Sequence, residues 1–162
     1  MKKSFITIVI AAIFSVTAFA GDGGKKNNTI INGDVNVTYV ALNNFKANFK
    51  DVKNATWKIT ANCQKASFNQ DGVLTTAFYD LKGEYLGFTQ NIGYTTIPFS
   101  AQEEINTKYT DYPVKEVIKF EYNGENTTIE PLVYFVDMKK GDSEVVLKVT
   151  PDAKVTFYKK VK

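Results

Sequence analysis

The segment VLTTAFYDLKGEYLGFTQNI, residues 73–92, decides the class of fold that we predict from this sequence. Residues 73–79 and 85–92 are rich in aromatic and β-branched side chains, which favour strands. Asp80-Leu81-Lys82-Gly83 between them is typical of a turn, because aspartate and glycine are favoured where the chain reverses. The segment therefore predicts two antiparallel strands joined by a short loop.

Similar strand signals extend outward from this hairpin. They are apolar or alternating stretches separated by turn residues. In the first of them, Trp57 shares its parity with Ile59 and Ala61, so we expect Trp57 to lie in the core. The additional strands are expected at residues 55–61, 65–69, 114–120, 129–138, 144–149 and 154–161.

Two amphipathic helices complete the predicted elements. Each carries apolar residues at i, i+4 and i+8, which lie on one helix face. These are Ala41, Phe45 and Phe49 within residues 38–49, and Ala101, Ile105 and Tyr109 in a helix that begins near Ser100. Because a helix followed by strands occurs twice, we predict an α+β fold, a tandem repeat of one helix plus about four antiparallel strands. Each repeat, residues 38–97 and 98–162, would form a two-layer α/β sandwich.

Residues 1–20 have the pattern of a secretory signal peptide. Lys2 and Lys3 precede an apolar run over residues 5–14, and Ala18-Phe19-Ala20 places small residues where signal peptidase selects its cut. The apolar run is too short to span a bilayer. We therefore expect export to the periplasm or secretion, no stable membrane anchor, and a flexible N-terminal arm over residues 21–37.

Composition excludes several kinds of chemistry. All 20 basic residues are lysine, and arginine and histidine are absent. Without the leader, 20 − 2 = 18 lysines stand against 17 acidic residues, so the charge is about neutral and no nucleic-acid partner is expected. The lack of histidine excludes the usual catalytic triads and histidine-based zinc sites, and Cys63 is the single cysteine. We predict that the protein is not an enzyme and carries no cofactor or metal.

Three stretches carry a family resemblance. Residues 49–57 are FKDVKNATW, at the end of an aromatic-striped helix, residues 77–86 are AFYDLKGEYL, and residues 97–100 are IPFS. They are similar to the F-P-x-A-x-x-V-x-W run, the Y-D-x-x-G-x-W-L hairpin and the linker of the PepSY-like, β-lactamase-inhibitor-like (BLIP-like) group of secreted bacterial proteins. The proline that usually follows the helix is replaced by Lys50. The resemblance implies a two-layer sandwich for each repeat, an exported protein and a protein-binding or inhibitory role.

Strand parity suggests where a partner would bind. Tyr79, Tyr85 and Tyr158 have the parity opposite to the expected core residues, and tyrosine is favoured at binding hot spots. We predict that they are binding anchors on an open sheet face, although half-covered strand residues and the hairpin loops at 80–84 and 139–142 are alternatives. The residues expected in the core are Leu74, Phe78, Leu86, Phe88, Val155 and Phe157.

Together these features predict a non-enzymatic module that binds another exported protein or peptide. Two other classes stay open. One is a chaperone-like or structural periplasmic protein that binds extended segments through a sheet edge. The other is a hydrolase with an unrecognised site.

Cleavage after Ala20 is a direct prediction of this pattern. N-terminal sequencing of the exported protein should begin at Gly21. A membrane-bound form that retains Met1 would contradict it.

Overall fold

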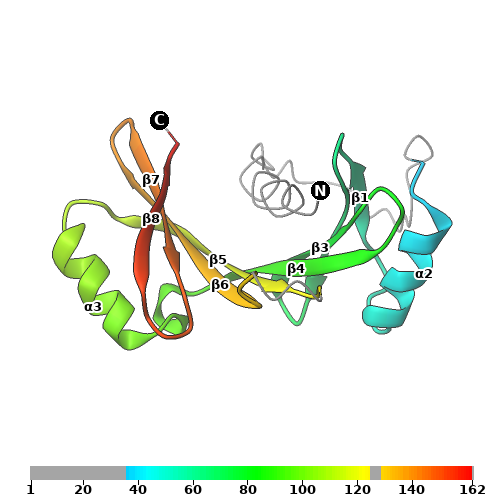
Figure 1. Cartoon of the computed structure of the whole chain (residues 1–162), viewed down its shortest axis with the longest axis horizontal. Helices are drawn as coiled ribbons and strands as arrows, with labels where there is room; N and C mark the ends of the chain where they lie inside the picture. Colours follow the sequence, from blue (N-terminus) through cyan, green and yellow to red (C-terminus); the bar gives the residue numbers. More distant parts are fainter. Residues whose placement is uncertain (1–35, 125–128, 162) are drawn as a thin grey trace. The chain divides into compact units, whose positions relative to one another are not determined.

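The computed structural model describes residues 36–124 and 129–161 (Figure 1). The predicted signal peptide and residues 21–35 of the predicted arm lie outside the described residues. Neither α-helix in the described part of the chain is long and apolar enough to cross a membrane. The elements are α2 (Tyr39–Asn48), β1 (Thr56–Ile59), β2 (Gln64–Gln70), β3 (Val73–Tyr79), β4 (Tyr85–Ile92), the 3-10 turn η1 (Tyr94–Thr96), α3 (Phe99–Lys108), β5 (Val114–Tyr122), β6 (Leu132–Lys140), β7 (Ser143–Val149) and β8 (Val155–Lys160).

The predicted fold class, an α+β tandem repeat of two-layer sandwiches, is wrong. The fold is dominated by one sheet of eight strands in the order β1 to β8, and only two ten-residue α-helices accompany it in the described residues. Most successive strands lie beside each other because short connections join them, whereas the connection from β4 to β5 is longer and contains η1 and α3. The similar stripes of the two helices misled the prediction, since any helix that packs on a sheet shows this spacing.

The described residues form two compact units, one ending at Gly87 and the other beginning at Phe88, and each is described by itself. In the first unit, cross-strand register places Trp57, Ala66 and Ala77 side by side on the face that α2 covers. The Phe45 ring lies 5.5 Å from the Trp57 ring. Trp57 is 8% exposed, which confirms that it belongs to the core. The buried cluster consists of Ala41, Phe45, Ala55, Trp57, Ala66, Phe68, Ala77 and Tyr79.

Helix α3 packs on the strands of the second unit. Ala101 and Ile105 are fully buried and Tyr109 packs against the same cluster, so the predicted stripe is confirmed. On the opposite face of these strands, Phe135 and Val146 are fully buried as well. Burial on both faces explains why this part of the sequence is continuously apolar rather than alternating. The cluster under α3 consists of Ile97, Ala101, Ile105, Val117, Val136, Met138, Val145, Leu147 and Val149.

The turn at residues 80–84 packs directly against the start of α2. Gly83 has a φ of +95°, and a Cβ at this position would lie 2.5 Å from the backbone nitrogen of Ala41. The Asn44 side-chain amide donates a hydrogen bond to the Gly83 carbonyl at 2.9 Å. Only glycine combines this backbone conformation with so close an approach to a helix.

Gln64 connects the same turn to the cap of α2. Its side-chain oxygen accepts a hydrogen bond from the Thr38 N–H at 2.8 Å, and its amide donates to the Asp80 carbonyl at 2.8 Å. The Thr38 hydroxyl in turn accepts from the Ala41 N–H, which caps the helix. Because Gln64 is 1% exposed, its polar atoms need these partners. The start of α2, β2 and the turn therefore form one hydrogen-bonded corner.

We expect Gly83→Ala to lower the free energy of unfolding by roughly 2–4 kcal/mol, because the new Cβ would meet helix backbone at a strained positive φ. Gly72→Ala is the matched control. Gly72 also has a positive φ, +83°, but nothing lies within 4 Å of its Cβ position. Its replacement should cost only about 1–2 kcal/mol. Urea denaturation measures both, and equal losses would contradict the close approach of the turn to α2.

Candidate functional site

Tyr79 does not lie on an open sheet face, so that part of the predicted site is wrong. Its side chain is 0% exposed, and its ring lies 5.5 Å from the ring of Trp57. The register pairs Gln64 with Tyr79 and Ala66 with Ala77, which puts Tyr79 on the side that α2 covers. Burial raises the pKa of the Tyr79 phenol strongly. Alternation within a single strand could not show which of its two faces the helix would cover.

Tyr85 lies beside Tyr79, whereas Tyr158 belongs to the second unit. The Tyr85 ring is 5.5 Å from that of Tyr79 and packs against the core of the first unit. The Tyr158 ring is 5.1 Å from that of Phe135, and burial raises the pKa of its phenol. Both side chains are half-buried. The structure thus brings two of the three predicted anchors together, but around the core of the first unit.

A β-bulge explains the altered parity near Tyr158. Val146 pairs with Lys159 and Leu147 pairs with Phe157, so Tyr158 is an extra residue in β8. Phe157 is 60% exposed although it was expected in the core. The same expectation is wrong for Leu74, which is 52% exposed, and right for Phe78, which is 1% exposed.

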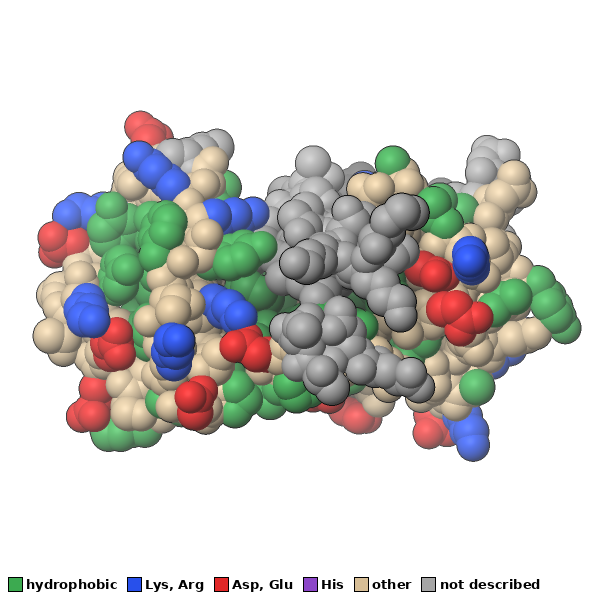
Figure 2. All heavy atoms as spheres, viewed as in Figure 1, with side chains coloured by type: hydrophobic (Ala, Val, Ile, Leu, Met, Phe, Trp, Pro, Cys, Tyr) green, Lys and Arg blue, Asp and Glu red, His purple; other side chains and the backbone are tan. Residues whose placement is uncertain are grey.

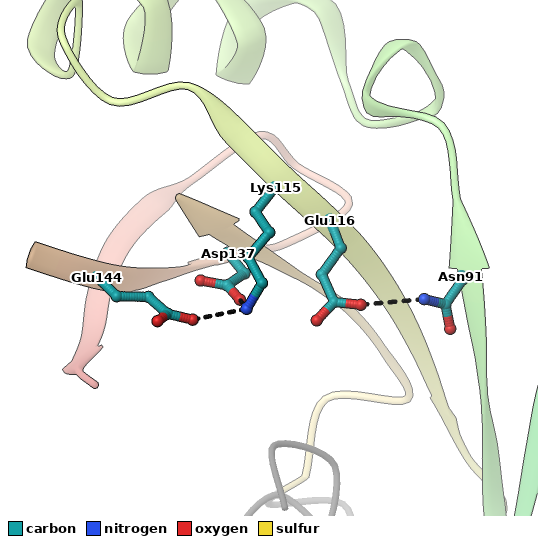
Figure 3. Close-up of polar contacts among 5 residues, drawn as sticks. All are labelled: Asn91, Lys115, Glu116, Asp137 and Glu144. Atoms are coloured by element: carbon teal, nitrogen blue, oxygen red, sulfur yellow. Dashed lines mark hydrogen bonds and ion pairs between the residues drawn. The ribbon is translucent and has the colours of Figure 1, made fainter. Parts of the chain in front are cut away.

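The second unit contains a cluster of charged side chains that the sequence analysis missed (Figure 3). Lys115 Nζ lies 3.0 Å from Asp137 Oδ2 and 2.8 Å from Glu144 Oε1. The two carboxylates are buried, at 2% and 7% exposure. Next to them the Asn91 amide donates a hydrogen bond to Glu116 at 3.1 Å. These residues come from β4, β5, β6 and β7.

A second bulge directs Lys115 toward this cluster. Val114 pairs with Met138 and Glu116 pairs with Asp137, so Lys115 is the extra residue in β5. Its side chain therefore turns to the face that carries Asp137 rather than to the face under α3. No signal in the sequence marks this insertion, because the register of β5 depends on its pairing with β6.

The charges of the cluster are set by burial and by Lys115. Hydrogen bonds to both carboxylates raise the pKa of Lys115, so this amine stays protonated. Burial raises the pKa of Asp137, whose Oδ1 finds no donor among the described residues. The hydrogen bond from Lys115 lowers the pKa of Glu144, and a protonated Asp137 can donate to Glu144. A protonated lysine is neither a nucleophile nor a base, so Lys115 acts in this cluster as the counter-charge of the two carboxylates.

Exposed apolar side chains gather at a different place, which we call the α2 tip and define as Tyr39, Val40 and Leu81. They are 77%, 44% and 53% exposed. Tyr39 and Val40 begin α2, and Leu81 belongs to the turn that packs against this end of the helix through Gly83. Figure 2 shows hydrophobic side chains at the surface beside α2. The sequence offered one signal for this surface, since Tyr39 and Val40 fall outside the helix stripe of Ala41 and Phe45.

Within the part of the chain that the structure describes, no group of three or more histidine, cysteine, aspartate or glutamate side chains is arranged to hold a metal ion. Cys63 is buried, with its sulfur 3.3 Å from the Thr60 hydroxyl. Two features that can contact other molecules are the α2 tip and the open edges of the sheet.

No protein-family model and no curated protein matches this sequence. Solved structures do share its fold. A BLIP-like protein from Bacteroides fragilis is 16% identical with a TM-score of 0.67, and the match covers 80% of this chain and 89% of that one. A DUF2874 family protein from Bacteroides uniformis is 12% identical with a TM-score of 0.68, and the match covers 77% of this chain and 90% of that one. A candidate periplasmic protein from Bacteroides eggerthii is 12% identical with a TM-score of 0.67, and the match covers 76% of this chain and 88% of that one. The chain thus has a BLIP-like fold, which confirms that part of the expected resemblance.

The charged cluster predicts a pH-dependent loss of stability on mutation. We expect Lys115→Met to lower the free energy of unfolding at pH 7 by about 1–3 kcal/mol, because two buried carboxylates lose their cation. Glu144 has a lowered pKa, so its contribution is present above its ordinary pKa of 4.5 and is lost as pH falls through the folded-state value. The loss should therefore shrink at pH 3.

Asp137→Asn is the matched control for this experiment. Burial raises the pKa of Asp137, so its ionised form costs stability at neutral pH, and an amide keeps an acceptor for Lys115. Its effect at pH 7 should stay below about 1 kcal/mol. Urea denaturation at both pH values measures these differences. A Lys115→Met loss that is the same at pH 7 and pH 3 would show that packing of the lysine stem, not charge, is responsible.

Proposed function

We propose that this protein is an exported, non-enzymatic module that recognises another exported protein or peptide in the periplasm or outside the cell. Two observations support the location: the leader pattern at residues 1–20, and the fold shared with a candidate periplasmic protein. The absence of histidine and arginine from the sequence and the protonated state of Lys115 favour binding over catalysis.

The observation that carries the proposal is the α2 tip. Large apolar side chains on a protein surface are favourable contacts for a partner, and tyrosine is enriched at hot spots. Tyr39 is 77% exposed although it stands on the first turn of a well-capped helix. Leu81 projects from a turn in which the Asp80 carboxylate accepts hydrogen bonds from the Lys82 and Glu84 N–H groups, at 2.9 and 2.8 Å. The tip therefore combines exposed apolar groups with a backbone that is already ordered.

Such order matters for affinity. Association costs free energy for every group that has to be immobilised, about 0.5–1.5 kcal/mol for a flexible side chain and more when a loop must also be ordered. The hydrogen bonds of Gln64 and the close approach of Gly83 hold the turn against the helix before any partner arrives. A partner would thus lose less free energy here than on an unsupported loop.

The α2 tip takes the place of the open-face site in this proposal. Tyr79 is excluded as a contact by its burial, while binding by Tyr85 or Tyr158 stays a prediction. The likeness to a BLIP-like structure does not extend the proposal to enzyme inhibition, because no inhibitory segment can be matched residue by residue. Membership of the PepSY-like group is likewise an expectation from the hairpin and helix motifs alone.

Pull-down from a periplasmic extract of the source organism, followed by binding measurements with the recovered partner, tests this proposal. Leu81→Ala should weaken binding of the partner by roughly 1–3 kcal/mol, the usual range for hot spots, and should leave the melting temperature of the protein unchanged. Leu74→Ala is the matched control, since Leu74 has nearly the same exposure but lies on the face of β3 opposite α2. Unchanged affinity in a Tyr39→Ala/Leu81→Ala double variant would place the interface elsewhere. Many unrelated partners would favour a chaperone-like role.

A further inference from the structure

Strand β8 forms one edge of the sheet, since β7 is its only neighbour among the strands of the described residues (Figure 1). An edge strand offers a row of backbone N–H and C=O groups to which another chain can add a strand. The outward groups of β8 follow from its pairing. The Thr150 N–H donates to the Lys154 carbonyl, and successive residues of an antiparallel strand alternate between the two sides. The N–H and C=O groups of Val155 and Phe157 therefore point away from β7.

The side chains of this edge combine an apolar group with positive charge. Phe157 is 60% exposed, and the exposed Lys154 and Lys160 precede and follow it in the sequence. The pairing with β7 places Lys160 on the same sheet face as Phe157 and Lys154 on the opposite face. Neither lysine forms an ion pair with another described residue. Residues 154–161 include no acidic residue. In Figure 2, hydrophobic side chains in the region of β7 and β8 are bordered by lysines.

We propose that β8 binds an extended, acidic segment of another protein as an added strand. Backbone hydrogen bonds to Val155 and Phe157 would hold the segment, and the Phe157 ring would contact its apolar side chains on one sheet face. Its carboxylates would project from the other face, toward Lys154, and Lys160 would add positive charge beyond the paired residues. The bulge at Tyr158 interrupts the regular ladder, so the segment would pair mainly with residues 154–157.

Charge decides which occupant fits this edge. A second copy of β8 would bring lysines against lysines, and lysine on an edge strand is a recognised barrier to such self-pairing. An acidic segment would avoid that repulsion, and its carboxylates would be attracted to the lysines of this edge. The opposite edge, β1, has only four residues and offers a shorter ladder. The proposal concerns the second unit, so it stands apart from the α2 tip of the first.

A labelled ten-residue peptide of alternating glutamate and valine is the probe, with a lysine–valine peptide of the same length as its control. Fluorescence anisotropy should show binding of the acidic peptide at least about tenfold tighter than that of the control. The double variant Lys154→Glu/Lys160→Glu should lower the affinity for the acidic peptide at least about tenfold. Lys46→Glu, a change in α2 of the first unit, should leave that affinity unchanged. Equal binding of the two peptides, or full binding by the double charge reversal, would overturn the proposal.

A second measurement locates the bound peptide. Hydrogen exchange followed by NMR should show slower exchange of the outward Val155 and Phe157 amides when the acidic peptide is present. Phe157→Pro removes one of these N–H groups, and proline is tolerated where a strand's N–H faces solvent, so the variant should fold yet lose more affinity than Phe157→Ala. Protection confined to other strands would overturn the proposal. The Leu81→Ala variant should bind this peptide with unchanged affinity. Failure of the α2 tip proposal and failure of the β8 proposal can therefore be told apart.

Discussion

Burial of one apolar stripe of a short helix against its strands is the interaction on which each unit depends. A ten-residue helix is marginal in isolation, because its first turn is costly to form and few hydrogen bonds follow. Burying a side chain such as Phe45 or Ile105 contributes roughly 1.5–3 kcal/mol, which outweighs the weak intrinsic preference of so short a helix. The stripe thus decides which sheet face is covered, and that choice places every other side chain of the strand.

Polar contacts at the start of α2 have a different role. The Gln64 side chain is buried between the helix cap and the turn, and each of its polar atoms has a partner. Such a network adds little net free energy but is costly to break, since an unpaired buried group loses water without compensation. It fixes the position of the turn relative to the helix. The exposed side chains of the α2 tip are consequently presented on a scaffold that is ordered in advance.

Two bulges give the second unit its particular surface. Without an extra residue at Lys115, the lysine would point to the apolar face under α3, and Asp137 and Glu144 would be buried without a cation. The extra residue at Tyr158 turns that ring toward Phe135 and interrupts the regular ladder of the edge strand. One inserted residue in each case changes both the electrostatics and the contacts that the strands can offer.

The sequence by itself determined where the elements lie and which face of each helix is buried, because the 3.6-residue period and the turn residues are local properties. The stripes of Ala41 and Phe45 and of Ala101 and Ile105, and the core position of Trp57, could all be predicted in this way. Sheet faces could not, because parity within one strand is symmetric until cross-strand register and a helix select a side. Tyr79 was therefore assigned to the wrong face, and the Lys115 cluster was missed. Only the tertiary structure decided these positions, together with the eight-strand order, because they depend on pairings between residues that are distant in the sequence.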